Sequence, residues 1–163
     1  MKGKGHKDMN TNINNININD NPDAKNVTIS ITGSITNAQE PGDSFELMTD
    51  GEYFQKGSSS VFSYVESELT GFDGLKTTFA VEPGQVVLRR ADGQTADMIF
   101  SENQKHHFLY ETPFGAVTMG IDTHSIKNNL HDRGGNLEIR YDIEVDNVAV
   151  SRNSFKINIY TPQ

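Results

Sequence analysis

Four histidines lie close together in the sequence, and histidine acts as a general acid or base and as a zinc ligand. They are His106, His107, His124 and His131. Zinc needs three or four ligands that converge on one point, and neighbouring strand residues such as His106 and His107 point to opposite faces. A cluster of His107, His124 and His131 requires their strands to pair. The favoured interpretation is exposed histidines near loop ends, and we predict no metal and no cofactor.

A second candidate for metal chemistry is the series of carboxylates at Asp142, Glu144 and Asp146. Alternate residues of a strand share one face, and here the other face is apolar. The tight glycine turn of a calcium loop is absent. The series therefore predicts a solvated outer face of a sheet.

The sequence contains none of the short motifs that mark common catalytic sites. Gly-x-Ser-x-Gly, Gly-x-x-x-x-Gly-Lys, Gly-x-Gly-x-x-Gly and His-Glu-x-x-His are all missing. An enzyme hypothesis has to rely on His107, or on a buried carboxylate such as Glu66, as acid or base. The sequence leaves enzymatic activity open and favours a protein without it.

Arg89 and Arg90 must face opposite sides of one strand. Arg89 shares its face with Val87, and Arg90 shares the other with Val86 and Leu88. An arginine is thus expected near the mouth of any enclosed interior, where it needs a carboxylate or an anionic ligand to offset its desolvation. The residues predicted to orient a bound ligand are Arg89, His107, Tyr110, Thr123 and Tyr141.

Alternation of apolar and polar residues dominates from residue 27 onward. In residues 136–145, for example, the apolar side chains Leu137, Ile139, Tyr141, Ile143 and Val145 share one face. This period of two is typical of antiparallel strands that line a single core. It predicts ten strands: 27–36, 44–56, 60–68, 75–82, 85–91, 95–101, 106–112, 116–124, 136–145 and 148–160.

Local signals refine this pattern. A bulge is predicted at Asp50-Gly51 and another near Asn153, where the alternation slips. Residues 123–130 are the only place where a single helical turn could fit. Residues 112–115, Thr-Pro-Phe-Gly, predict a tight hairpin turn, beside which Tyr110 and Phe114 could cover a barrel end.

Ten strands in up-and-down order either expose two sheet edges or curl shut. Closure removes the edges, and a barrel of eight to ten strands holds either its own side chains or one small ligand. The predicted fold is therefore all-β, an antiparallel up-and-down meander barrel, with a β-sandwich as the alternative.

The composition limits partners and setting. The chain of 163 residues carries a formal net charge of -8, which repels phosphate backbones, so we expect neither nucleic acid nor membrane as a partner. There is no cysteine, no signal peptide and no apolar run long enough to span a membrane, which favours a cytoplasmic protein. The Asn-rich residues 1–26 predict a disordered tail, or alternatively an extra strand, before a single domain of residues 27–163.

Residues 106–115, His-His-Phe-Leu-Tyr-Glu-Thr-Pro-Phe-Gly, resemble a known bacterial family, as do Gly-Ile-Asp-Thr at 120–123 and residues 135–143. This is the YwiB-like family, a domain of unknown function with a calycin-like, lipocalin-like β-barrel. The resemblance covers about residues 27 to 160 and implies the barrel fold and a cytoplasmic bacterial protein, but no reaction. The Gly-x-Trp of true lipocalins is absent, since Gly33 is followed by Ser34 and Ile35.

These observations favour a binding module that holds a small apolar or amphipathic ligand in the barrel. The alternative is a protein-interaction domain with a barrel filled by its own side chains. An enzyme ranks third. No protein partner can be named from the sequence.

Overall fold

The computed structural model describes residues 21–37, 42–68, 73–91 and 97–162. Their alternating residues form ten strands, as predicted: β1 (Lys25–Thr36), β2 (Asp43–Lys56), β3 (Ser59–Val65), β4 (Lys76–Glu82), β5 (Gln85–Arg90), β6 (Met98–Ser101), β7 (Lys105–Thr112), β8 (Gly115–His131), β9 (Gly134–Val145) and β10 (Val148–Tyr160). Residues 1–20 of the predicted tail lie outside the described residues, and β1 begins at Lys25, within the predicted tail. The described residues contain no helix with the length and apolarity needed to cross a membrane.

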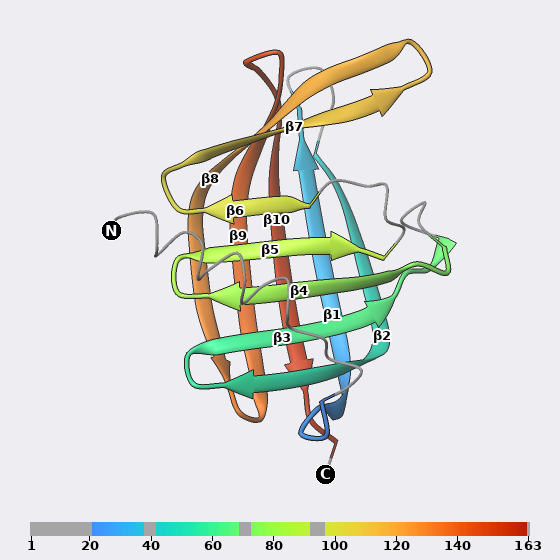
Figure 1. Ribbon diagram of the computed structural model, residues 1–163, viewed down its shortest axis with the longest axis vertical. Coiled ribbons are helices and arrows are strands. Elements are labelled where there is room, and N and C mark those ends of the chain that lie inside the picture. Colours follow the sequence, from blue (N-terminus) through green and yellow to red (C-terminus); the bar gives the residue numbers. More distant parts are fainter. Residues whose placement is uncertain (1–20, 38–41, 69–72, 92–96, 163) are drawn as a thin grey trace.

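Strands that follow one another in the sequence pair antiparallel, except β6 and β7, and β1 also pairs with β10. The resulting sheet has the order β6-β5-β4-β3-β2-β1-β10-β9-β8-β7, so its two edges are β6 and β7. In Figure 1, β3 to β6 cross in front of β1, β8, β9 and β10 at a steep angle. The curled sheet is a nearly closed all-β barrel, which confirms the predicted fold class.

The seam of the barrel lies where the segment after β6 meets the middle of β8. The Asn103 N–H donates to the Thr123 carbonyl at 2.9 Å, and the Thr123 N–H donates to the Gln104 carbonyl at 3.3 Å. The Ile126 N–H donates to the Glu102 carboxylate at 3.0 Å. These bonds satisfy backbone groups that an open edge would leave without partners.

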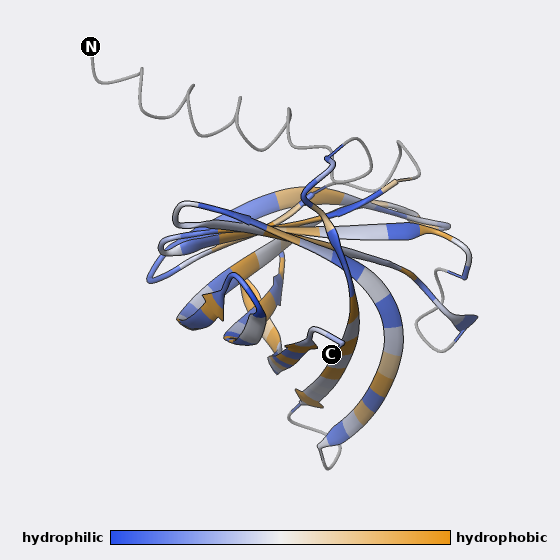
Figure 2. Ribbon diagram, turned by 90° about the horizontal axis from the view of Figure 1, so that it is seen from below, coloured by the Kyte–Doolittle hydropathy of each residue, from blue (hydrophilic) through white to orange (hydrophobic). Residues whose placement is uncertain are grey.

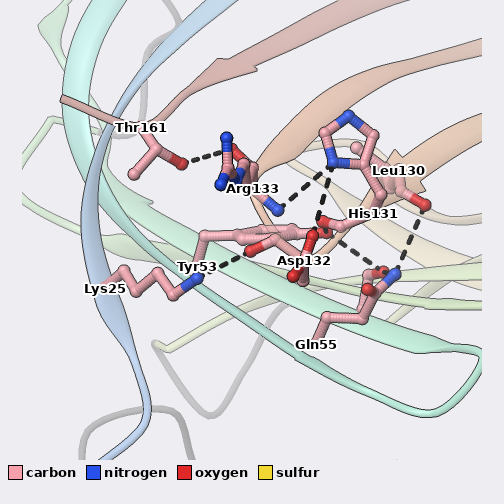
Figure 3. Close-up of polar contacts among 9 residues, drawn as sticks. Lys25, Tyr53, Gln55, Leu130, His131, Asp132, Arg133 and Thr161 are labelled. Carbon is pink, nitrogen blue, oxygen red and sulfur yellow. Dashed lines mark hydrogen bonds and ion pairs between the residues drawn. The ribbon is translucent and has the colours of Figure 1, made fainter. Parts of the chain in front are cut away.

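The turn between β8 and β9 lies at the lower end of the barrel in Figure 1, and Figure 3 shows its polar contacts with the rest of the chain. The Tyr53 hydroxyl on β2 donates to the His131 carbonyl at 2.6 Å, and Lys25 Nζ on β1 donates to the Asp132 carbonyl at 2.8 Å. The Thr161 hydroxyl after β10 donates to the Arg133 carbonyl. Two strands and the segment after β10 therefore hold this turn in place.

The core consists of the inward residues of the strands, and hydropathy alternates along each ribbon (Figure 2). Phe62 and Phe79 stack with their ring centroids 4.7 Å apart. Aromatic pairs of this kind add stability beyond the apolar area that they bury. The largest fully buried side chains also include Tyr53, Phe100, Ile29, Ile121, Leu137, Ile139 and Ile157.

The bulge predicted at Asp50-Gly51 is wrong, because the pairing of β2 with β1 and β3 continues without a shift. Gly51 instead allows β2 to lie close to side-chain and backbone atoms of its two neighbouring strands. A Cβ at this position would lie 2.4 Å from Ile29 Cδ1 and 2.4 Å from the Ser63 carbonyl oxygen. The second predicted bulge exists, but the register shifts between Ala149 and Ser151 rather than at Asn153.

Residues 123–130, where the sequence left room for a single helical turn, form no helix, since β8 continues as a strand to His131. A register shift between Thr123 and Ser125 moves the later residues to the other parity. The turn at residues 112–115 is present, with Gly115 at φ +119° and the Phe114 N–H donating to the Thr112 hydroxyl at 3.1 Å.

The expected cover of a barrel end by Tyr110 and Phe114 is not found. The β7–β8 hairpin projects beyond the other strands at the top of Figure 1. Phe114 is 99% exposed and Tyr110 is 50% exposed. The hairpin therefore carries these rings away from the core.

Candidate functional site

A cavity of about 400 Å³ lies at one end of the barrel, and its wall draws on β1, β2, β4, β5, β9, β10 and the end of β3. Most of its wall is apolar: Ile31, Ile35, Phe45, Leu47, Phe79, Leu88 and Phe155. Its polar side chains include Tyr64, Glu66, Arg90 and Tyr141, which we call the polar corner. A mostly apolar wall with a few polar groups is typical of small-molecule sites.

The strand register brings three of the inner polar residues into one row. Tyr64 on β3 pairs with Thr77 on β4, and Thr77 pairs with Arg90 on β5. Directly paired residues of an antiparallel sheet share one face, so all three side chains face the interior. Glu66 lies two residues beyond Tyr64 and therefore has the same parity.

The Glu66 carboxylate interacts with two residues of this row, through a hydrogen bond and an ion pair. The Thr77 hydroxyl donates to Glu66 Oε2 at 2.5 Å, and Arg90 Nε lies 3.7 Å from the same oxygen. The Glu66 side chain is 1% exposed and that of Arg90 is 13% exposed. Because an isolated buried charge is costly, the opposite charges of Glu66 and Arg90 stabilise each other in this position.

Burial raises the pKa of the Tyr64 hydroxyl well above its ordinary value. The negative charge of Glu66 and a hydrogen bond to that carboxylate raise it further, while the Arg90 charge acts in the opposite direction. The phenol therefore stays protonated and donates to Glu66 at neutral pH.

Tyr141 on β9 is the fourth residue of the polar corner and is 5% exposed. Its ring meets Phe100 edge-on at 4.9 Å and Phe155 at 5.8 Å. Burial raises the pKa of its hydroxyl, and the Arg90 charge lowers it by a smaller amount. Among the described residues none forms a hydrogen bond with this hydroxyl, which leaves a neutral donor and acceptor at the cavity wall.

Of the five residues predicted to orient a ligand, Tyr141 lines the cavity. Thr123 is fully buried and pairs with Tyr141 across β8 and β9, but it lies at the seam outside the cavity wall. The Thr123 hydroxyl has no hydrogen-bond partner among the described residues. The structure thus brings these two residues together.

The other three predicted residues lie away from the cavity. Arg89 faces outward and forms an ion pair with Asp97, in which Nη2 is 2.6 Å from Oδ2. The His107 ring lies over Gly120, also outside the barrel. Tyr110 lies on the projecting hairpin.

Sequence reasoning placed an arginine at the mouth and named Glu66 as a buried carboxylate, but it missed Tyr64. Alternation along β3 could have identified Tyr64, because it lies two residues after Phe62 and therefore on the same face. Both side chains are buried. Arg90 shares its parity with Val86 and Leu88, but Val87, which has the parity of Arg89, is buried as well, so parity does not separate the two arginines.

On the outer face, Asp122, His124 and Asp142 have possible ligand atoms within 4.8 Å of one another. The shift after Thr123 makes His124 the additional residue in β8, next to the paired Asp122 and Asp142. Oxygen and nitrogen ligands of this kind suit divalent ions. Here Asp142 forms ion pairs with His124 at 3.1 Å and with Arg152 at 3.6 Å.

The cluster of His107, His124 and His131, which the sequence allowed but did not favour, does not form, because His131 lies at the turn between β8 and β9 (Figure 3). The prediction that Asp142, Glu144 and Asp146 lie on a solvated face is only partly correct. The Glu144 side chain is 7% exposed, and Lys105 Nζ on β7 lies 2.9 Å from its Oε2. A neighbouring strand therefore covers part of this face.

Comparison with known proteins places the fold. A family model described as a domain of unknown function (DUF1934) matches residues 29–157. The chain belongs to this family. The DUF1934 match extends from β1 to β10, so it includes the whole polar corner.

The chain is 28% identical over 100 residues to the uncharacterized beta-barrel protein YwiB of Bacillus subtilis (strain 168), which covers 61% of this chain and 69% of YwiB. The crystal structure of the ywiB protein from Bacillus subtilis matches with a TM-score of 0.73 at 21% identity, over 86% of this chain and 94% of that chain. The resemblance predicted from the sequence is confirmed, and this DUF1934 member shares the ywiB fold.

Proposed function

We propose that this protein is a binding module that holds a small apolar or amphipathic molecule in the cavity of the barrel. The volume of about 400 Å³ lies within the range of roughly 300 to 1,000 Å³ that is usual for small-molecule pockets. The apolar wall would supply most of the binding free energy, at about 25 cal/mol per Å² of apolar surface removed from water. The polar corner would orient the ligand.

The observation that carries the proposal is the combination of a mostly apolar cavity wall with one buried polar corner. Protein interiors are ordinarily packed to the density of organic crystals. A barrel that served only as a scaffold would gain stability by filling this space with side chains. The retained space, with Tyr141 at its edge, supports a role in binding.

Two tryptophan substitutions on β2 test this proposal. Leu47 lines the cavity, whereas its neighbour Met48 points to the other face and is 66% exposed. We expect the wild-type protein to bind an uncharged hydrophobic fluorophore such as N-phenyl-1-naphthylamine. Leu47→Trp should weaken this binding roughly tenfold or more by occupying the cavity, and Met48→Trp should leave it unchanged.

The two variants carry the same new ring on the same strand, so the comparison separates the cavity from the surface. Native mass spectrometry of protein purified from cells would add a direct search for a retained molecule. Equal fluorophore binding by both variants, or no binding by the wild type, would refute the proposal.

A further inference from the structure

The charges at the polar corner compensate each other without a ligand. Glu66 and Arg90 carry opposite charges, both line the cavity and both are largely buried. Thr77 and Tyr64 add hydrogen bonds to the Glu66 carboxylate. The other charged residue of the wall is Asp43, which is exposed at the start of β2.

This arrangement disfavours a charged ligand head. An anionic head beside Arg90 would bring a second carboxylate next to Glu66, with Asp43 as a third negative charge. A cationic head would face Arg90 in a place where Glu66 is already engaged. In either case one buried charge would lack compensation, which is costly in an environment of low polarity.

The Tyr141 hydroxyl offers what an uncharged head requires. It lies at the cavity wall, 5% exposed, and no described residue satisfies it. A phenol both donates and accepts a hydrogen bond, so it can pair with an alcohol, a carbonyl or an ether. Phe100 and Phe155 hold its ring, which fixes the direction of the hydroxyl.

We propose that the cavity selects uncharged amphipathic molecules whose hydroxyl or carbonyl head forms a hydrogen bond with Tyr141 beside the Glu66–Arg90 pair. This inference rests on the proposed function and specifies the ligand class of the same cavity. The apolar wall would hold the hydrocarbon part of the molecule, and the internally neutral corner would exclude ionised heads.

Three probes of equal chain length test the selectivity in the wild-type protein. These are 1-decanol, decanoate and decylammonium, titrated at pH 7.5 against a bound uncharged hydrophobic fluorophore. We expect 1-decanol to bind at least about tenfold more tightly than either ion, because each ion must bury an uncompensated charge. This comparison requires no variant and is independent of any effect of mutation on folding.

Tyr141→Phe then tests the contact itself, because it removes the hydroxyl and keeps the ring. Loss of one hydrogen bond should weaken 1-decanol binding roughly 2- to 10-fold. Tyr160→Phe is the matched control, since Tyr160 is 52% exposed and outside the cavity wall, and it should bind as the wild type does. Thermal unfolding of both variants shows whether they remain folded.

The outcomes separate the two proposals. Equal or tighter binding of decanoate or decylammonium would overturn the neutral-head inference and leave the binding module intact. Binding of 1-decanol that is the same in folded Tyr141→Phe would overturn the role of Tyr141. If no probe and no fluorophore bound, the binding module itself would be refuted.

Discussion

His106 is a half-buried histidine at the barrel seam, where its Nε2 lies 3.0 Å from the Ser101 hydroxyl. Burial lowers its pKa below the ordinary value, and the neighbouring His107 lowers it further. The folded protein thus favours the neutral imidazole. Between the lowered pKa and the ordinary value of about 6.5, the unfolded chain binds more protons than the folded one.

The free energy of unfolding should therefore fall as the pH is lowered through about 6.5, and His106 should contribute to that fall. We expect His106→Gln to lose less stability than the wild type between pH 7.5 and 5.5, measured by urea denaturation at each pH. His107→Gln should retain most of the wild-type dependence, because burial rather than His107 is the larger cause of the shift. Identical pH dependence in His106→Gln and wild type would contradict this assignment.

At the residue scale, alternation predicts that one arginine of the pair faces inward but cannot identify which. Val86, Val87 and Leu88 are all buried, so both faces of β5 look apolar in the sequence. The outward position of Arg89 becomes evident only with its partner Asp97, because the strand that carries Asp97 must first be placed beside β5. Local periodicity does not predict which distant segments pair in this way.

At the element scale, β2 must pass close to both of its neighbours at Gly51. A Cβ there would lie 2.4 Å from a backbone oxygen, Ser63 O, which cannot move without breaking the sheet. At Gly33 the obstacle is instead the Phe45 ring at 2.2 Å, and that side chain is partly exposed and can rotate. The two glycines therefore differ in what a methyl group would displace.

We expect Gly51→Ala to destabilise the protein by about 1–3 kcal/mol through overpacking, and Gly33→Ala to have a smaller effect. Urea denaturation of the two variants beside wild type gives the comparison. A larger loss of stability in Gly33→Ala would show that the Phe45 ring, and not the close approach of the strands at Gly51, limits the packing.

Strand positions were predictable because one face of most strands is polar and the other apolar. β8 is the exception. The additional residue His124 changes the parity in its middle, and the exposed residues Lys127, Asn128 and Asn129 follow, so the second half of the strand shows no clear alternation. A helical turn was a reasonable interpretation of that segment, but pairing with β9 along its whole length keeps it extended.

At the scale of the whole molecule, the need to protect sheet edges predicted a barrel, and the structure confirms it. The sequence could not show that closure would leave a cavity at one end and a tied turn at the other. That result depends on how β3 to β5 lie across β1 and β2. The cavity wall draws on both groups of strands, so a bound molecule would connect them.

A ligand that contacts both groups of strands and binds only the folded state should stabilise the whole barrel against unfolding. At a free concentration of 100 times Kd the gain is about 2.7 kcal/mol. For a chain of this size this corresponds to an increase in Tm of roughly 5–10 °C. We expect this increase with 1-decanol in the wild type, and little or none in Leu47→Trp at the same concentration.

Hydrogen exchange measured on the same samples locates the effect. Protection should rise in β1 and β2 as well as in β3 to β5, because each of these strands supplies a residue of the cavity wall: Ile31, Leu47, Tyr64, Phe79 and Leu88 in turn. An equal increase in Tm in Leu47→Trp, or protection confined to the projecting β7–β8 hairpin, would place the bound molecule on the surface. Protection on both sides of the cavity would mean that one interior ligand stabilises the barrel as a single unit.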